Sequence, residues 1–218
     1  MTSRVRGAGR HPGMNLPAVV RAKWAERDVA TSVLAEAFRD EPLAAWLVPD
    51  QRWRSAVLSG SLRILVEYAL LWGDIDLLDD QSAVAVWIRR YRPLPPPRNF
   101  DRQLAAACGD HLDRFTQLTR LLDARRPNES HYHLAALAVR PGARNTGCGS
   151  TLLRHHHTRL DQLGVPAYVE ATSTAVRDFY TRHGYRPDQP IRLPGGGEIH
   201  PMRRPARHAL TRTSAPQG

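Results

Sequence analysis

The sequence predicts an α/β domain with one mixed β-sheet flanked by helices. Three observations support this expectation. The chain has 218 residues, a length that suits one domain with short tails. Short segments in which every second residue is apolar lie between longer segments with apolar residues at helical spacing. No internal repeat interrupts that order, so a repeat architecture is excluded.

The N-terminal half should contain one strand, two helices and a hairpin. Its elements are expected at residues 18–24 (strand), 25–39 and 51–71 (helices), and 74–78 and 82–88 (strands). Pro42 is expected to close the first helical segment, because proline interrupts helical hydrogen bonding. The proline run at 93–97 is expected to be a stiff connector.

The C-terminal half should begin with one long helix and continue with alternating strands and helices. Its elements are expected at residues 100–122 (helix), 132–139 (strand), 147–163 (helix), 167–170 (strand), 174–183 (helix) and 191–202 (a hairpin around three glycines). The segments 1–14 and 206–218 lack periodicity and are expected to be disordered tails. The folded domain is therefore expected at 15–205.

The net charge of +10 does not by itself indicate a nucleic-acid protein. Seven of these charges lie in 1–14 and 200–218, which contain no acidic residue, so the remainder is only mildly basic. We therefore do not expect a nucleic-acid surface.

No uninterrupted apolar run reaches membrane-spanning length, and no membrane association is expected. Cys108 and Cys148 form no disulfide framework, which favours a reducing, cytoplasmic compartment.

The segment LAVRPGARNTGCGSTLL, Leu137 to Leu153, is the most informative motif of the chain. Arg144, Gly147 and Gly149 form an R-x-x-G-x-G turn between an expected strand and an expected helix. Backbone N–H groups at a helix N-terminus favour a phosphate. The turn lacks the third glycine of a dinucleotide fingerprint and the lysine of a P-loop. A plain two-glycine loop is the competing interpretation of the turn alone.

The segment FYTRHGY, Phe179 to Tyr185, follows about thirty residues later. With the turn as motif A and this segment as motif B, the chain resembles the GNAT acyltransferase superfamily. It looks closest to the puromycin N-acetyltransferase type over about residues 17–190. The resemblance implies a GNAT fold, a single mixed and mostly antiparallel sheet flanked by helices. It also implies an N-acyltransferase that uses acetyl-CoA or another acyl-pantetheine thioester and no metal.

The resemblance also implies a site for the acyl donor. In this family the strand before the turn splays from its neighbour, so free backbone groups of Leu137, Ala138 and Val139 would pair with the pantetheine amides. The turn would hold the pyrophosphate through main-chain N–H groups, with a charge-assisted contact from the arginine. Its expected binding residues are Arg144, Asn145, Thr146, Gly147, Cys148, Gly149 and Ser150.

Three residues are candidates for catalysis. Tyr180 matches a family tyrosine near the thioester sulfur and would protonate the departing thiolate; a core aromatic is its alternative role. Glu170 matches a glutamate of the puromycin type and would take a proton from the amine, directly or through water. An ordinary charge at a strand end is its alternative. His133 is the other candidate base, with a packed core histidine as its alternative.

Three further sequence features carry weaker signals. His155, His156 and His157 are consecutive on a helix and cannot chelate one ion together, so a helix surface is expected. Cys148 is interpreted as a small residue beside the phosphate rather than a nucleophile. Val176 stands where the puromycin-type pattern has asparagine, and the hydroxyl of Ser173 or Thr174 would have to substitute for it.

The expected acceptor is the amine of a small molecule, such as an antibiotic or an amino-nucleoside. It would attack the thioester directly, in resistance or in natural-product tailoring. We expect the early helices and the final hairpin to shape its pocket, with Trp46, Trp53, Trp87 and Tyr91. A phosphopantetheine arm on an acidic acyl carrier protein, or an aminoacyl-tRNA, is kept as an alternative donor. The oligomeric state is left open, with a homodimer as one alternative.

Overall fold

The computed structural model describes residues 17–91, 94–95 and 99–206. The expected tail at 1–14, all but the first residue of that at 206–218, and most of the 93–97 connector lie outside these residues. One eight-stranded sheet forms the centre of the described chain, in the order β1-β2-β3-β4-β5-β8-β6, with β7 paired to β8. The strands are β1 (Val19–Arg21), β2 (Gly73–Leu78), β3 (Ala83–Arg90), β4 (His131–Val139), β5 (Ala167–Ala171), β6 (Arg186–Pro187), β7 (Ile191–Arg192) and β8 (Glu198–Arg204).

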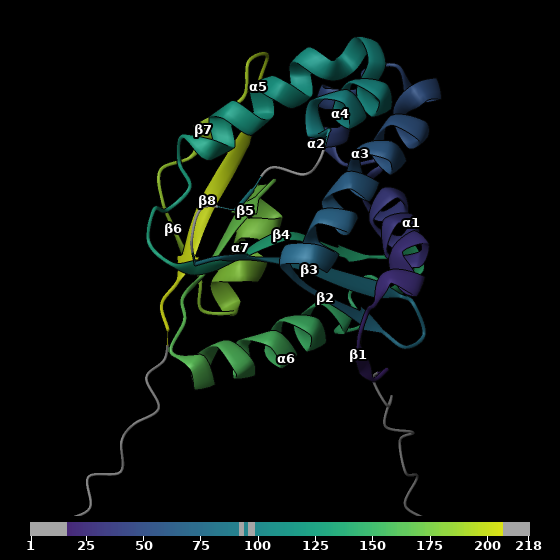
Figure 1. Ribbon diagram of the computed structural model, residues 1–218. Helices are drawn as coiled ribbons and strands as arrows, with labels where there is room; N and C mark the ends of the chain where they lie inside the picture. Colours follow the sequence, from purple (N-terminus) through teal and green to yellow (C-terminus); the bar gives the residue numbers. More distant parts are fainter. Residues whose placement is uncertain (1–16, 92–93, 96–98, 207–218) are drawn as a thin grey trace, which may run out of the picture.

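Only the pairing of β4 with β5 is parallel, and every other strand pair is antiparallel. The expected mixed, mostly antiparallel sheet is therefore confirmed. Helices cover both faces (Figure 1). They are α1 (Arg27–Phe38), α2 (Pro42–Leu47), α3 (Gln51–Trp72), α4 (Phe100–Cys108), α5 (Leu112–Asp123), α6 (Cys148–Leu163) and α7 (Thr174–Arg182).

The two faces of the sheet carry separate apolar clusters. On one face, α1 and α3 pack on alternate residues of β3, including Val84, Val86 and Ile88. On the other face, Trp87 packs with Leu152 and other residues of α6. Because successive side chains of a strand point to opposite faces, one central strand supplies both clusters. This arrangement explains why β3 is apolar without interruption from Ala83 to Ile88.

Several expected boundaries are wrong in informative ways. Pro42 begins α2 rather than closing a segment, because the first turn of a helix needs no N–H from proline. The long helix expected at 100–122 is broken at Gly109, whose φ of +50° lies outside the right-handed helical region. The strand expected at 18–24 is β1 alone, and a 3₁₀ turn follows at Trp24–Glu26.

The histidine run does not lie on the helix surface as expected. Only His155 is exposed, while His156 and His157 are buried. The Nδ1 of His156 lies 2.7 Å from Asp76, and its ring stacks on Trp87 with centroids 4.1 Å apart. Asp76 thus satisfies the Nδ1 of the buried imidazole, while the Nε2 has no hydrogen-bond partner among the described residues. Among the described residues, no group of three or more His, Cys, Asp or Glu could hold a metal ion.

Helix α3 is the one described helix with the length and mean hydropathy of a membrane span, which alone is weak evidence. Its apolar residues pack against α1 in one cluster and line a cavity on the same side.

The basic segment at 200–218 is not entirely a tail. Arg203 and Arg204 belong to β8, and buried Arg204 donates to Asp161 at 2.7 Å.

Candidate active site

Strands β4 and β5 separate at the centre of the sheet. Their parallel pairing runs from Tyr132 with Ala167 to Leu134 with Val169 and then ends. At this point β4 carries a bulge, because Trp87 pairs with Leu134 and Val86 pairs with Ala136. Ala135 is thus the extra residue that turns β4 away from β5. One edge of β4 beyond Leu134 therefore lacks a strand partner among the described residues, as the family resemblance implies.

The three residues expected to meet the pantetheine lie on this open stretch. Leu137, Ala138 and Val139 pair through their other edge with β3. Backbone groups facing the separation are therefore free to bind an extended amide-bearing chain, as a further strand would.

The glycine turn joins β4 to the N-terminus of α6. Asn145 and Gly147 have φ values of +64° and +94°, and α6 begins at Cys148. The first backbone hydrogen bond into the helix runs from Thr151 N–H to the Gly147 carbonyl at 2.9 Å. Within the described chain, the N–H groups of residues 145–150 donate to no backbone carbonyl. A run of free N–H groups at a helix N-terminus fits a pyrophosphate.

Three side chains of the turn have partners within the protein. Arg144 donates to the Ala37 carbonyl at 2.8 Å and lies 3.4 Å from Glu41, so it ties the turn to α1 and α2. Its expected contact with a phosphate stays a prediction. The sulfur of Cys148 is buried, 3.1 Å from the Thr146 hydroxyl. That burial agrees with a small packed residue. Thr146 and Ser150 stay predicted binding residues through their N–H groups.

Gly149 serves a different purpose from Gly147. A Cβ at Gly149 would lie 3.4 Å from Phe179 and 3.6 Å from Val139, so the position is limited by space. Helix α7 thereby approaches the turn closely, which brings motif B next to motif A.

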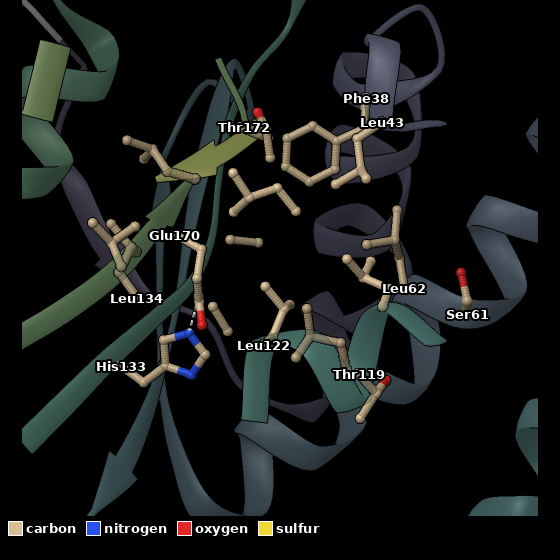
Figure 2. Close-up of a pocket in the computed structure, with 18 of the residues that line it drawn as sticks. Phe38, Leu43, Ser61, Leu62, Thr119, Leu122, His133, Leu134, Glu170 and Thr172 are labelled. Carbon is tan, nitrogen blue, oxygen red and sulfur yellow. Dashed lines mark hydrogen bonds and ion pairs between the residues drawn. The ribbon is translucent and has the colours of Figure 1, made fainter. Parts of the chain in front are cut away.

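A cavity of about 740 Å³ opens at the separation of β4 and β5. Its wall includes the open stretch of β4 and Tyr180 of α7, and it continues between α1, α2, α3, α4 and α5. Apolar side chains such as Phe38, Leu62 and Leu122 form most of the helical side (Figure 2). The part of the cavity beside the open stretch of β4 and the part between the helices thus form one continuous space.

Glu170 and His133 form a pair on the strand side of this cavity (Figure 2). The Nε2 of His133 lies 2.6 Å from the Oε2 of Glu170, and both side chains are buried. Burial raises the pKa of the Glu170 carboxyl, but the charge and hydrogen bond of His133 outweigh it, and the net pKa is lowered. The Oε1 of Glu170 and the Nδ1 of His133 have no hydrogen-bond partner in the described chain.

Tyr180 reaches the same cavity from α7 and is buried. Burial and, to a lesser degree, the charge of Glu170 raise the pKa of its phenol far above the ordinary value. The hydroxyl is therefore protonated at every pH at which the protein would work. The two residue types expected to act as acid and base thus face one cavity.

Other expectations about the pocket are wrong or reassigned. The early helices do line the cavity, but Trp46, Trp53, Trp87 and Tyr91 do not. Trp46 instead donates its indole N–H to the Pro194 carbonyl at 2.7 Å, while Trp53 is exposed and Trp87 lies on the other face. Of the final hairpin, Ile199 is the residue in the wall.

The hydroxyl of Ser173, a proposed substitute for the missing asparagine, accepts a hydrogen bond from Val176 N–H at 3.2 Å and caps α7. Val176 itself lines the cavity.

The sequence reasoning missed the polar residues at the far end of the cavity. Tyr68, Arg90, Asp123 and Arg126 all line it. The alternation of β3 was a usable signal for Arg90, because this residue shares the face of Ile88. Asp123 and Arg126 lie at and beyond the end of α5, and only the tertiary fold brings them to the sheet.

Comparison with known proteins relates this fold to a family of acetyltransferases. A family model described as Acetyltransferase (GNAT) domain matches residues 109–187. That span contains α5, the separated strands β4 and β5, the glycine turn and α7. Over these residues the chain matches a GNAT acetyltransferase domain. The expected GNAT fold is thereby confirmed, and the chain is an N-acyltransferase enzyme.

Solved structures agree over most of the chain. A histone acetyltransferase HPA2 and related acetyltransferase from Corynebacterium glutamicum is 29% identical with a TM-score of 0.67, over 88% of this chain and 97% of that chain. Arylalkylamine N-acetyltransferase 2 from Aedes aegypti is 13% identical with a TM-score of 0.58, over 86% and 98%. A polyamine N-acetyltransferase from Drosophila melanogaster is 18% identical with a TM-score of 0.55, over 86% and 99%. The last two likenesses concern the fold alone.

Proposed function

We propose that this GNAT domain transfers an acetyl group from acetyl-CoA to the amine of a small molecule. The donor supplies an acyl thioester. The open edge of β4 at Leu137–Val139 would bind the pantetheine amides, and the free N–H groups of 145–150 would bind the pyrophosphate. The proposal is supported by the turn itself, where free N–H groups and two positive φ values are the backbone features of known anion-binding turns.

The Glu170–His133 pair would take the proton of the acceptor. The Oε1 of Glu170 is buried without a partner, and such an atom is stabilised by a donor N–H. An ammonium placed there would pass one proton to the pair and present its lone pair to the carbonyl carbon. His133, 2.6 Å from Oε2, would hold the carboxylate in place and share the proton.

Tyr180 would complete the proton balance. Its protonated phenol would donate to the leaving sulfur as the amide bond forms and the carbon–sulfur bond breaks. The nitrogen would lose its second proton as the amide forms and return it to the tyrosinate, so the products would be the N-acetylated amine, the free thiol and one proton released through the Glu170–His133 pair. The observation that carries the proposal is the Glu170–His133 pair and Tyr180 lining one cavity at the separation of β4 and β5.

The acceptor is proposed to be a small molecule with an apolar part. The helical side of the cavity is mostly apolar, and its volume of about 740 Å³ lies in the range of small-ligand sites. The resemblance to the puromycin N-acetyltransferase type supports an antibiotic- or nucleoside-like amine as one acceptor to test. Both cysteines are free and buried, which supports our proposal of a reducing, cytoplasmic compartment.

The direct experiment is an assay of thiol release with acetyl-CoA and a panel of amines, with product masses measured. We expect an N-acetylated product together with micromolar binding of CoA in calorimetry. Absence of CoA binding, together with acyl transfer only from a phosphopantetheinylated carrier protein, would contradict the free acetyl-CoA donor. Activity that requires aminoacyl-tRNA and falls steeply with salt would contradict it as well.

A further inference from the structure

Arg90 is a cation at the end of the cavity farthest from the glycine turn. In the antiparallel register of β3 and β4, Ile88 lies opposite His133 and Arg90 lies opposite His131. Since alternate residues share a face, Arg90 and His133 belong to the same side of the sheet. The step of two positions from His133 to His131 places Arg90 about 7 Å farther along the strand, away from the turn.

The charge of Arg90 has no close compensation. In the described part of the chain its guanidinium forms no ion pair, and its Nε is buried without a hydrogen-bond partner. The two carboxylates in reach are already engaged, Glu170 by His133 and Asp123 by Arg126. Arg126 also lines the cavity, and its Nε is likewise buried without a partner. Two guanidinium groups with unpaired donors thus border one cavity.

Buried donors without partners are costly, and a cavity that holds two such cations is stabilised by an anion. Guanidinium groups match a carboxylate best, because their N–H donors can bind both oxygens at once. Burial is the main cause that lowers the pKa of Arg90, and the charge of Arg126 adds to it. The negative charge of a carboxylate placed between them would oppose this lowering of the pKa of Arg90.

We infer that Arg90 and Arg126 bind a carboxylate of the acceptor, so that this enzyme acylates amines of the amino-acid class. The inference rests on the proposed function. Along β4 the order is the phosphate turn, the pantetheine edge, the Glu170–His133 pair and then Arg90. An amine at the Glu170–His133 pair would therefore direct its carboxylate away from the donor and toward Arg90.

The test uses matched acceptors that differ only by a carboxylate. L-phenylalanine is compared with 2-phenylethylamine, L-leucine with 3-methylbutylamine, and L-alanine with ethylamine. We expect wild-type kcat/KM to be higher for the carboxylated member of a pair. Arg90→Gln should raise the KM for the carboxylated member about 10- to 100-fold, while the KM for the decarboxylated amine should change less than about threefold. Arg90→Lys should restore part of the loss.

Arg125→Gln is the matched control, because Arg125 is exposed and does not line the cavity. Equal losses for both members of each pair in Arg90→Gln would overturn the inference, as would higher wild-type kcat/KM for the decarboxylated amines. A succinyl-CoA arm with 2-phenylethylamine tests the other source of a carboxylate. A loss confined to that arm would assign the arginines to the acyl group and overturn the acceptor site.

Calorimetry separates this inference from the proposed function. N-acetyl-L-phenylalanine is titrated into wild type and Arg90→Gln, without any donor. Binding by wild type that Arg90→Gln weakens at least tenfold supports the carboxylate site, even if no amine is acetylated. No binding, or equal binding by both proteins, overturns the site even if acetylation of other amines is observed.

Discussion

The Nε2 of His133 lies 2.6 Å from the Oε2 of Glu170, and the two residues come from neighbouring parallel strands. Their pairing ends one register position beyond His133, where β4 bends away from β5. The pair therefore borders the separation of the strands at which we propose that the acyl donor binds. Each side chain also keeps one buried polar atom without a hydrogen-bond partner in the described chain, Oε1 in Glu170 and Nδ1 in His133. The pair therefore retains one atom on each residue that can exchange a proton with a substrate.

The first prediction concerns proton transfer by this pair. Glu170→Gln should lower kcat about 100-fold or more, because the amide cannot accept the proton of the amine. The loss should be similar from pH 5 to 9, because the lowered pKa of Glu170 keeps the wild-type carboxylate ionised over that range. Rates are measured from pH 5 to 9 with acetyl-CoA and the best amine. Glu198→Gln, an exposed carboxylate on β8, is the control and should keep the wild-type profile.

The second prediction concerns the acid. Tyr180→Phe should lower kcat about 100-fold with little change in the KM for acetyl-CoA, because it removes a proton donor and little volume. Since burial and Glu170 raise the pKa of Tyr180, wild type should show no alkaline limb from this group below pH 10. Tyr185→Phe is the control, because Tyr185 is equally buried but its hydroxyl bonds to His157 outside the cavity. Wild-type kcat in Tyr180→Phe would remove this residue from the mechanism.

The third prediction concerns the phosphate turn. Gly147→Ala should raise the KM for acetyl-CoA about tenfold, since a φ of +94° costs a residue with Cβ roughly 1–2 kcal/mol and the turn must adjust. Calorimetry with CoA measures the same loss without catalysis. Gly142→Ala is the matched control in the same connection, because its added Cβ would meet nothing within 4 Å and its φ is not positive. Equal CoA binding by both variants would count against the turn as the pyrophosphate site.

Much of this site could be predicted from local sequence, and the remainder depends on contacts between distant segments. The turn with Gly147 and the neighbouring helix are local features, so periodicity and glycine spacing locate them. The Glu170–His133 contact is not local, and the sequence left the two as competing bases. The burial of His156 depends on Asp76, eighty residues away. The role of Arg90 at the cavity depends on strand register, which a single sequence does not specify.

The fourth prediction concerns stability and the buried histidine run. Burial is the main cause that lowers the pKa of His157 to about 3, while the unfolded chain binds that proton near the ordinary histidine pKa of 6.5. Between these values the unfolded state holds one more proton than the folded state. The free energy of unfolding should therefore fall as pH decreases below 6.5, by about 1.4 kcal/mol per pH unit for each such group.

His157→Gln isolates this effect, because the amide keeps a hydrogen-bonding group toward Tyr185 and does not titrate. Between pH 6 and 4 its unfolding free energy should depend on pH less steeply than that of wild type, by about 1.4 kcal/mol per unit. Denaturant unfolding at a series of pH values measures the two slopes. His155→Gln is the matched control two positions away, and its exposed side chain should leave the wild-type slope unchanged. Identical slopes in wild type and His157→Gln would mean that His157 takes up its proton without unfolding the protein.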